Sequence, residues 1–308
     1  MKYTENALNI LTVRSFPKKG PAWIHNNLIG NESVDVLCEK MKCQLSDFCE
    51  KRDEIKNSLS RLGESADGVV AIGDANFPET RGIVNKSDRP VALFYKGNLS
   101  LLQKTSLNIA IIGVLTPDKK VEISEKIVAD YIVKKGATIL SGLALGCDTI
   151  AHKVALNNHG KTIAILPSPL NNIHPKENSE LAFDIVQQGG LLISEYYESP
   201  KGRNDLVSRF VVRDRLQALY SDAVLLVASY AVNDSGKDCG SRHAMGKAKS
   251  YGIKRAVIYN DNKHRDNSMY DLNRQLLKED SSVVRIDSDN MINSIDRLLK
   301  RHIENSIF

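Results

Sequence analysis

The chain contains little cysteine, and its cysteines are not arranged for cross-linking or for a metal. Five cysteines occur in 308 residues, an odd and sparse set that argues against a disulfide framework and favours a reducing compartment. Cys38, Cys43 and Cys49 form no C-x-x-C pair, and His25 is the only histidine near them, whereas zinc sites use tight ligand pairs. We therefore interpret these three as thiols on helix faces and expect no metal.

Long apolar runs are also missing. The longest, residues 223–232, is far shorter than the ~20 residues that a membrane-spanning helix needs. The apolar patch at residues 7–13 is interrupted by Asn9 and has no small-residue cleavage site, so it is not typical of a signal peptide. The sequence predicts a cytoplasmic protein that does not enter a membrane.

Charge of one sign is not in large excess. The net charge is +5, from 42 basic and 37 acidic residues. Such a small excess permits binding to a polyanion without requiring it, so local clusters of cations matter more than the total. The length allows one large domain and a small one with a substantial core.

The chain divides into two regions that differ in their pattern of apolar residues. Residues 1–62 place apolar residues at steps of three and four, with breaks at Gly20-Pro21 and Gly30-Asn31, which predicts a small helical domain. This domain is either a packing cap or an interaction module. Residues 63–308 form the second predicted domain, which closes with a packing helix near the C-terminus.

Short apolar, β-rich runs recur through the second domain. They are residues 68–72, 91–95, 109–113, 137–141, 161–166, 190–194, 223–229, 255–259 and 282–286. Most are continuous rather than alternating, as in strands that are buried on both faces. Helix-period segments lie between them, and that alternation predicts an α/β fold with an extended Rossmann-like, doubly wound and mainly parallel sheet.

A glycine-containing loop after the fourth of these runs is the first candidate site. In SGLALGCDTIAH, residues 141–152, it places Ser141, Gly142 and Gly146 before a helix, where free backbone N–H groups and the helix dipole favour an anion. Asp148 is a suitable N-cap. The run is neither G-x-G-x-x-G nor a Walker A loop, so no nicotinamide or ATP cofactor is indicated. The alternative is a tight turn that needs glycine for geometry alone.

A basic segment, residues 201–215, is the second candidate. Its five cations outnumber its two carboxylates, with Phe210 among them. The cations are Lys201, Arg203, Arg209, Arg213 and Arg215. Cations beside an exposed ring suit single-stranded nucleic acid, whose backbone needs charge and whose bases stack. On a helix, Phe210 shares one side with Arg213 and Asp214. The alternative is a solvated amphipathic helix whose phenylalanine belongs to the core.

A second polar loop follows the seventh run. Ser235, Gly236 and Lys237 precede another helix-like segment and are suited to a second phosphate cradle, with the lysine as counter-charge. The alternative is a long polar loop without a ligand. Both loops are expected at the same edge of the sheet.

Together these runs resemble the DNA-processing protein A (DprA/Smf) family. Residues 141–152 are similar to its S-G-x-A-x-G-I-D-x-x-A-H motif, with Cys147 in place of isoleucine. Residues 210–215, FVVRDR, are similar to its F-x-x-R-N-R motif, with Asp214 in place of asparagine. Further similarity lies in SEY at 194–196, in residues 77–98 and in the serine and glycine at 235–236. The resemblance covers about residues 65–290.

The resemblance implies function as well as fold. It implies a non-enzymatic protein without a cofactor that binds single-stranded DNA without sequence specificity, often as a homodimer, and assists a RecA-type recombinase during DNA uptake. It also implies a DNA pocket lined by Ser141, Gly142, Gly146, Phe210, Arg213, Arg215, Ser235 and Gly236. Residues 1–62 resemble, more weakly, the small helical (SAM/HhH-like) domain of that family.

Several positions depart from the family pattern. Val114 and Leu115 follow a glycine where the family has G-S/T-R, so an expected cation is missing. Pro169 replaces a glycine, SGKDCGS at 235–241 replaces S-G-S-L-x-T-A, and Asp214 adds a negative charge. These departures are compatible with weaker DNA binding or with a different phosphorylated ligand.

Two other functions remain open from the sequence. One is a nucleotide-binding sensor or phosphoribohydrolase-like protein on the same scaffold. The G-G-G-x-G-T-x-x-E run of such hydrolases is absent, and Glu195, the loop glutamate best placed after a strand, is interpreted as a hydrogen-bond anchor. His152 is interpreted as a packing residue. The other function is protein interaction through residues 1–62, whose deletion would then abolish function while DNA binding persists.

Overall fold

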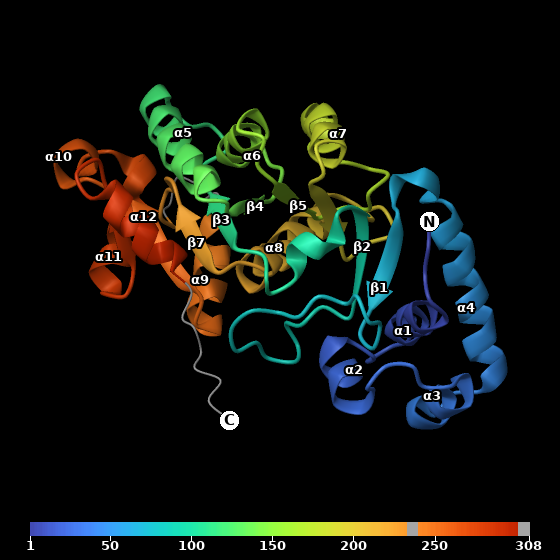
Figure 1. Ribbon diagram of the computed structural model, residues 1–308. Helices are drawn as coiled ribbons and strands as arrows, with labels where there is room; N and C mark the ends of the chain where they lie inside the picture. Colours follow the sequence, from blue (N-terminus) through green and yellow to red (C-terminus); the bar gives the residue numbers. More distant parts are fainter. Residues whose placement is uncertain (233–239, 301–308) are drawn as a thin grey trace.

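The computed structural model describes residues 1–232 and 240–300, and the chain begins with four helices (Figure 1). They are α1 (Glu5–Ser15), α2 (Pro21–Asn27), α3 (Val34–Met41) and α4 (Leu45–Ser60). Local signals set their starts: the Thr4 hydroxyl accepts a hydrogen bond from Ala7 N, and Pro21 opens α2. The N-terminal residues are helical, as their apolar periodicity predicts.

The strands form one sheet in the order β1-β2-β6-β5-β4-β3-β7-β8-β9. Their bounds are β1 (Gly68–Ala71), β2 (Ala92–Gly97), β3 (Asn108–Ile112), β4 (Thr138–Ser141), β5 (Thr162–Leu166), β6 (Leu191–Ser194), β7 (Ala223–Leu226), β8 (Lys254–Ile258) and β9 (Val284–Ile286). Each predicted run coincides with one of them. The pairs from β6 across to β9 are parallel, whereas β2 pairs antiparallel with β1 and β6. The doubly wound, mainly parallel prediction is confirmed.

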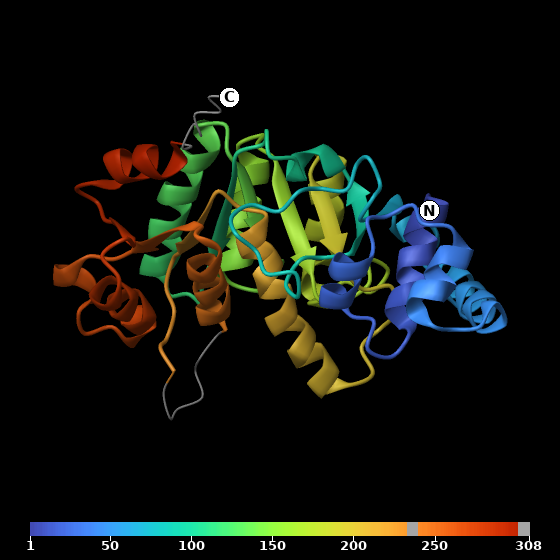
Figure 2. The same ribbon diagram turned by 90° about the horizontal axis from the view of Figure 1, so that it is seen from below.

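Helices cover both faces of this sheet. The remaining helices are α5 (Lys119–Lys134), α6 (Cys147–Asn157), α7 (Ser179–Gln187), α8 (Arg203–Leu219), α9 (Ser241–Tyr251), α10 (Asp261–His264), α11 (Asp271–Glu279) and α12 (Met291–Leu299). In Figure 1, α5, α6 and α7 lie on one side of the strands, and α8 and α9 lie on the other. Figure 2 shows α8 crossing the strands with its first turns projecting beyond them.

The winding direction reverses beside β3. From β3 the chain proceeds through β4, β5 and β6 on one side, and it adds β7, β8 and β9 on the other. In open α/β sheets, ligands bind beyond the carboxyl ends of the strands at such a reversal. The fold therefore predicts a ligand site at the loops that follow β3, β4 and β7.

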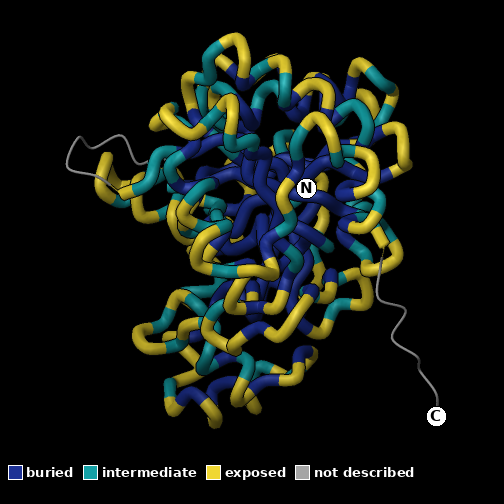
Figure 3. Tube along the Cα trace, turned by 90° about the vertical axis from the view of Figure 1, so that its left-hand side faces the viewer, coloured by how far each residue is buried: buried dark blue, intermediate teal, exposed yellow. Residues whose placement is uncertain are grey.

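Apolar side chains form two buried clusters. The larger holds the central strands and the helices around them, and the dark trace in Figure 3 shows this interior. The smaller joins the N-terminal helices to the sheet, because Phe48 of α4 and Phe94 of β2 belong to the same cluster. The division at residues 62 and 63 stays a prediction, since helices and strands share this core. Within residues 1–232 and 240–300, no helix has the length and apolar character needed to cross a membrane.

Candidate functional site

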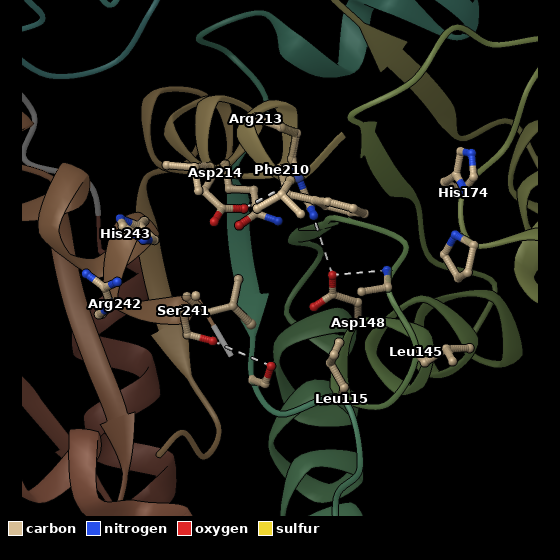
Figure 4. A pocket seen from close by; sticks show the side chains of 18 residues that line it. Leu115, Leu145, Asp148, His174, Phe210, Arg213, Asp214, Ser241, Arg242 and His243 are labelled. Carbon is tan, nitrogen blue, oxygen red and sulfur yellow. Dashed lines mark hydrogen bonds and ion pairs between the residues drawn. The ribbon is translucent and has the colours of Figure 1, made fainter. Parts of the chain in front are cut away.

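A cavity of about 560 Å³ lies where the winding direction reverses (Figure 4). Its walls come from the loops after β3, β4 and β5, from one side of α8 and from the start of α9. Leu115, Leu145 and Val211 bring apolar surface to the walls, while Asp148 and Arg213 bring charge. The volume lies within the roughly 300–1,000 Å³ of small-ligand pockets.

Asp148 organises the glycine loop after β4. Its carboxylate accepts hydrogen bonds from Gly142 N at 3.0 Å and from Ala144 N at 3.2 Å. The predicted N-cap role of Asp148 is wrong: Gly146 is the N-cap, at φ 74°, and Asp148 lies in the first turn of α6. A buried carboxylate needs donors, and it takes them from the loop itself. These two amides are therefore engaged inside the protein rather than free for a phosphate.

Gly142 is small because an arginine passes over it. A Cβ at this position would lie 1.2 Å from Arg213 Nη1, so any larger residue would have to displace the guanidinium. Gly146 is constrained by its positive φ and by the carbonyls of Val114 and Leu115, each 2.4 Å from where its Cβ would be. The hydroxyl of Ser141 is buried and donates to Ile111 O at 2.6 Å. The residues of the predicted loop thus shape the site rather than line it with free polar groups.

Arg213 is the centre of charge in the cavity. Its Nη1 lies 4.0 Å from the carboxylate of Asp148, and its Nε lies 3.4 Å from that of Asp214. With its oxygen facing the arginine, the Gln217 amide accepts from Arg213 Nη1 at 2.7 Å and from Gly142 N at 3.1 Å. The guanidinium also lies 5.6 Å from the centre of the Phe210 ring. One buried cation is therefore shared by two carboxylates beside an aromatic ring.

Burial shifts the acids and bases around this arginine. Burial raises the pKa of Asp148, and Arg213 opposes that shift. Burial also raises the pKa of Asp214 to about 6, again against the effect of Arg213. Burial lowers the pKa of His152 to about 3, and its Nδ1 lies 2.6 Å from Thr162 Oγ1. His152 is a neutral packing residue, as the sequence predicts.

Only one of the five predicted cations of the basic segment lines the cavity. Phe210, Arg213 and Asp214 share the cavity side of α8, as their spacing predicts. Arg215 instead pairs with Glu195 through both terminal nitrogens, at 2.6 and 2.7 Å. That pair agrees with the anchoring role predicted for Glu195.

The other three cations of the segment also lie outside the cavity. Arg209 lies over the Tyr196 ring and pairs with Asp205 at 3.0 Å. Lys201 and Arg203 are exposed at the start of α8. They are therefore accessible to a partner on the surface rather than inside the cavity.

The predicted second loop falls outside the described residues. Ser235, Gly236 and Lys237 lie in the stretch 233–239, for which the structure gives no description. The sequence did not single out several polar lining residues, which are His174, Gln217, Ser241, Arg242 and His243. Two signals were available: Gln217 lies seven residues after Phe210, and Arg242 and His243 open the helix that follows the loop.

Comparison with known proteins places the chain among relatives of one kind. The family model described as DNA recombination-mediator protein A matches residues 68–296. Protein Smf of Escherichia coli (strain K12) is 33% identical over 176 residues, which cover 57% of this chain and 45% of that protein. The chain spans about half the length of the curated relatives it matches.

Two solved structures share the fold. DNA processing protein A from Streptococcus pneumoniae has a TM-score of 0.70 and 24% identity, covering 96% of this chain and 98% of that one. A structure described as showing the single-stranded DNA binding mode of DNA processing protein A from Helicobacter pylori has a TM-score of 0.60 and 29% identity. It covers 75% of this chain and 95% of that one.

Proposed function

Because the chain belongs to the DNA recombination-mediator protein A family, we propose that it binds single-stranded DNA in the cavity that α8, the start of α9 and the loops after β3, β4 and β5 enclose. The observation that carries this proposal is the placement of Phe210 on the cavity wall of α8, with the exposed cations Lys201 and Arg203 at the start of the same helix. A ring for stacking a base, combined with cations for the backbone, is the combination that single strands require. The Helicobacter pylori relative is described as a single-stranded DNA binder, which supports the same ligand here.

The base enters the cavity and the backbone stays outside it. Two carboxylates, Asp148 and Asp214, share Arg213 on the inner wall, which disfavours a phosphate there. Arg203 lies seven residues before Phe210 and is exposed, so it shares the helix side of the cavity about 10 Å further along the axis. Lys201 lies close to it, and Arg242 opens α9 across the cavity. These cations line the route of the phosphates.

The remaining predicted site residues take supporting roles in this proposal. Gly142 and Gly146 let the loop and Arg213 approach closely, and Ser141 ties β4 to β3. Arg215 and Arg209 fix α8 against the segment that follows β6. Ser235, Gly236 and Lys237 stay proposed phosphate contacts.

The wider role in this proposal is the one that the family resemblance implies. The protein acts in DNA uptake and recombination, where it protects single strands and assists a RecA-type recombinase. It works in the cytoplasm as a homodimer and catalyses no reaction. The titratable groups near the loop fit a binding role, because Asp148 holds backbone amides and His152 packs against β5.

The test is fluorescence anisotropy with labelled oligo-dT and a matched duplex across a salt series. We expect preference for the single strand and an affinity that falls with salt. Phe210→Ala removes the stacking ring and should weaken binding by about 1–3 kcal/mol, roughly 5- to 150-fold. Phe183→Ala is the matched control, because that ring is 61% exposed on α7, across the sheet.

Two results would overturn the proposal. One is the absence of salt-sensitive binding to the single strand at low salt, which would favour the nucleotide-sensor alternative and a screen of small nucleotides. The other is equal loss of affinity in Phe210→Ala and Phe183→Ala. That outcome would place the DNA outside this cavity.

A further inference from the structure

The carboxylate of Asp214 has unused acceptor capacity on the cavity wall. It lies four residues after Phe210 on the same side of α8, and Figure 4 shows its oxygens directed into the cavity. Arg213 Nε, 3.4 Å from Oδ1, is its ion-pair partner among the described residues. No hydrogen bond from a described residue reaches either oxygen, although the side chain is only 15% exposed. An ionised carboxylate accepts up to about four hydrogen bonds, so this wall can accept them from a ligand that enters the cavity.

The four DNA bases differ in what they donate to such a group. Guanine carries an N1–H and an N2 amino group side by side, which match the two oxygens of one carboxylate. Adenine and cytosine each offer one amino group next to a ring acceptor. Thymine offers one N–H between two carbonyl oxygens, which a carboxylate repels.

The surroundings of Asp214 favour a base over an anion in this position. Phe210 supplies a ring at one wall, and Val207 and Val211 supply apolar surface beside it. Arg213 is already shared by two carboxylates, so it retains little attraction for a phosphate. A neutral, flat ligand with adjacent donors fits these walls.

We propose that Asp214 makes this cavity selective for guanine within a single strand, by accepting hydrogen bonds from guanine N1–H and N2–H while Phe210 stacks on the ring. This inference rests on the proposed function, that single-stranded DNA enters the cavity. It gives Asp214 a specificity-determining role at the position where the resembling family carries asparagine. An asparagine amide offers one acceptor and two donors, and so does not distinguish the bases in the same way.

The experiment compares labelled 15-mers of thymine in which three isolated positions carry guanine, hypoxanthine, cytosine or thymine. Isolated guanines keep the strand from folding on itself, and hypoxanthine is guanine without its N2 amino group. The guanine strand should bind roughly 5- to 150-fold more tightly than the thymine strand. Hypoxanthine should lose most of that gain, because one of its two donors is absent.

Asp214→Asn is the test variant, and Asp205→Asn on the same helix is its control. Asp205 pairs with Arg209 and does not line the cavity, so its variant should keep the guanine preference. Asp214→Asn should bind the guanine and thymine strands with similar affinity, so the ratio of the two affinities within each protein is the readout. Far-ultraviolet circular dichroism confirms that both variants are folded.

Each outcome bears on a different claim. Equal binding of all four strands by the unmodified protein would overturn the guanine inference and leave single-stranded DNA binding intact. A guanine preference that persists in Asp214→Asn would also overturn it, because another group would then read the base. Absence of binding to any strand would instead overturn the proposed function and this inference with it.

Discussion

Replacing Arg215 tests whether this residue of α8 stabilises the fold or contacts the DNA. Its terminal nitrogens lie 2.6 and 2.7 Å from the two carboxylate oxygens of Glu195, and its Nε donates to Asp88 O at 2.9 Å. The two side chains are 8% and 2% exposed. Removing one partner of a buried pair leaves the other charge uncompensated and costs about 3–5 kcal/mol. We therefore predict that Arg215→Ala lowers the free energy of unfolding by that amount, a large part of the roughly 5–15 kcal/mol typical of a native protein.

A second variant separates an effect on stability from an effect on DNA binding. Arg215→Met combined with Glu195→Leu removes both charges, and replacing a whole buried pair with apolar residues is often neutral or stabilising. The carbonyls of Asp88 and Val212 each lose a donor, which costs about 1 kcal/mol apiece. The double variant should therefore recover most of the stability. Urea unfolding followed by circular dichroism measures all three proteins.

The same proteins are then assayed with labelled oligo-dT at a temperature where each is folded. If Arg215 acts only through the fold, the double variant binds within about twofold of the unmodified protein, the margin expected of a change away from the interface. This reasoning would be refuted if Arg215→Ala had the same free energy of unfolding as the unmodified protein but bound DNA more weakly. That pattern would return Arg215 to the DNA contacts that the family resemblance implies.

Three further predictions follow from buried groups. Gly142→Ala should displace Arg213, because the new Cβ would lie 1.2 Å from Nη1, and so should weaken both stability and DNA binding, as measured by urea unfolding and anisotropy. Glu125→Gln should raise the urea midpoint at pH 7, because burial raises the pKa of Glu125 well above its usual value. The unfolded chain releases this proton above about pH 4.5 while the folded chain keeps it, so stability falls as pH rises from there, and the glutamine variant should lose that slope between pH 5 and 8. The guanine preference should fall between pH 7.5 and 5, because burial raises the pKa of Asp214 to about 6, and the protonated carboxyl can accept from only one of the two guanine donors.

Each of these predictions has a matched control. Gly246→Ala has no atom within 4 Å of the new Cβ and should be neutral or stabilising. Asp130→Asn changes a carboxylate on the same helix as Glu125 that pairs with Lys134 at the surface, and it should leave the pH slope unchanged. The pH comparison is made against Asp214→Asn, because other charged or titratable groups share the cavity wall. These are Asp148, His174, Arg213, Arg242 and His243.

The strands could be predicted from the sequence because most of them are continuous apolar runs. A central parallel strand is buried on both faces, and β3 to β7 are buried throughout. The placement of Phe210 with Arg213 on one side of a helix was predictable for a similar reason, since it depends on helical periodicity alone. Both predictions rest on local rules that tertiary packing did not override.

The details of the glycine loop were not predictable in this way. The sequence indicates that Gly142 must be small, and it leaves open whether a ligand or a side chain needs the space. That side chain is Arg213, which lies 71 positions away in the sequence and comes from the opposite face of the sheet. Likewise, the carboxylate of Asp148 turns back to the loop amides because it is buried beside Arg213, and its burial depends on how α6 and α8 pack.

The angular positions around α8 explain why its cations have different roles. Successive residues turn by about 100°, so Arg203 and Asp214 fall within roughly 40° of Phe210, on the cavity side, whereas Arg215 falls roughly 140° away. Arg209 falls roughly 100° away in the other sense, over Tyr196. A count of positive charge along residues 201–215 therefore overstates the charge that a ligand in the cavity meets. Within that segment, the cation next to the ligand is Arg213, already shared by two carboxylates, and this explains why the structure favours a base inside and the phosphates along the rim.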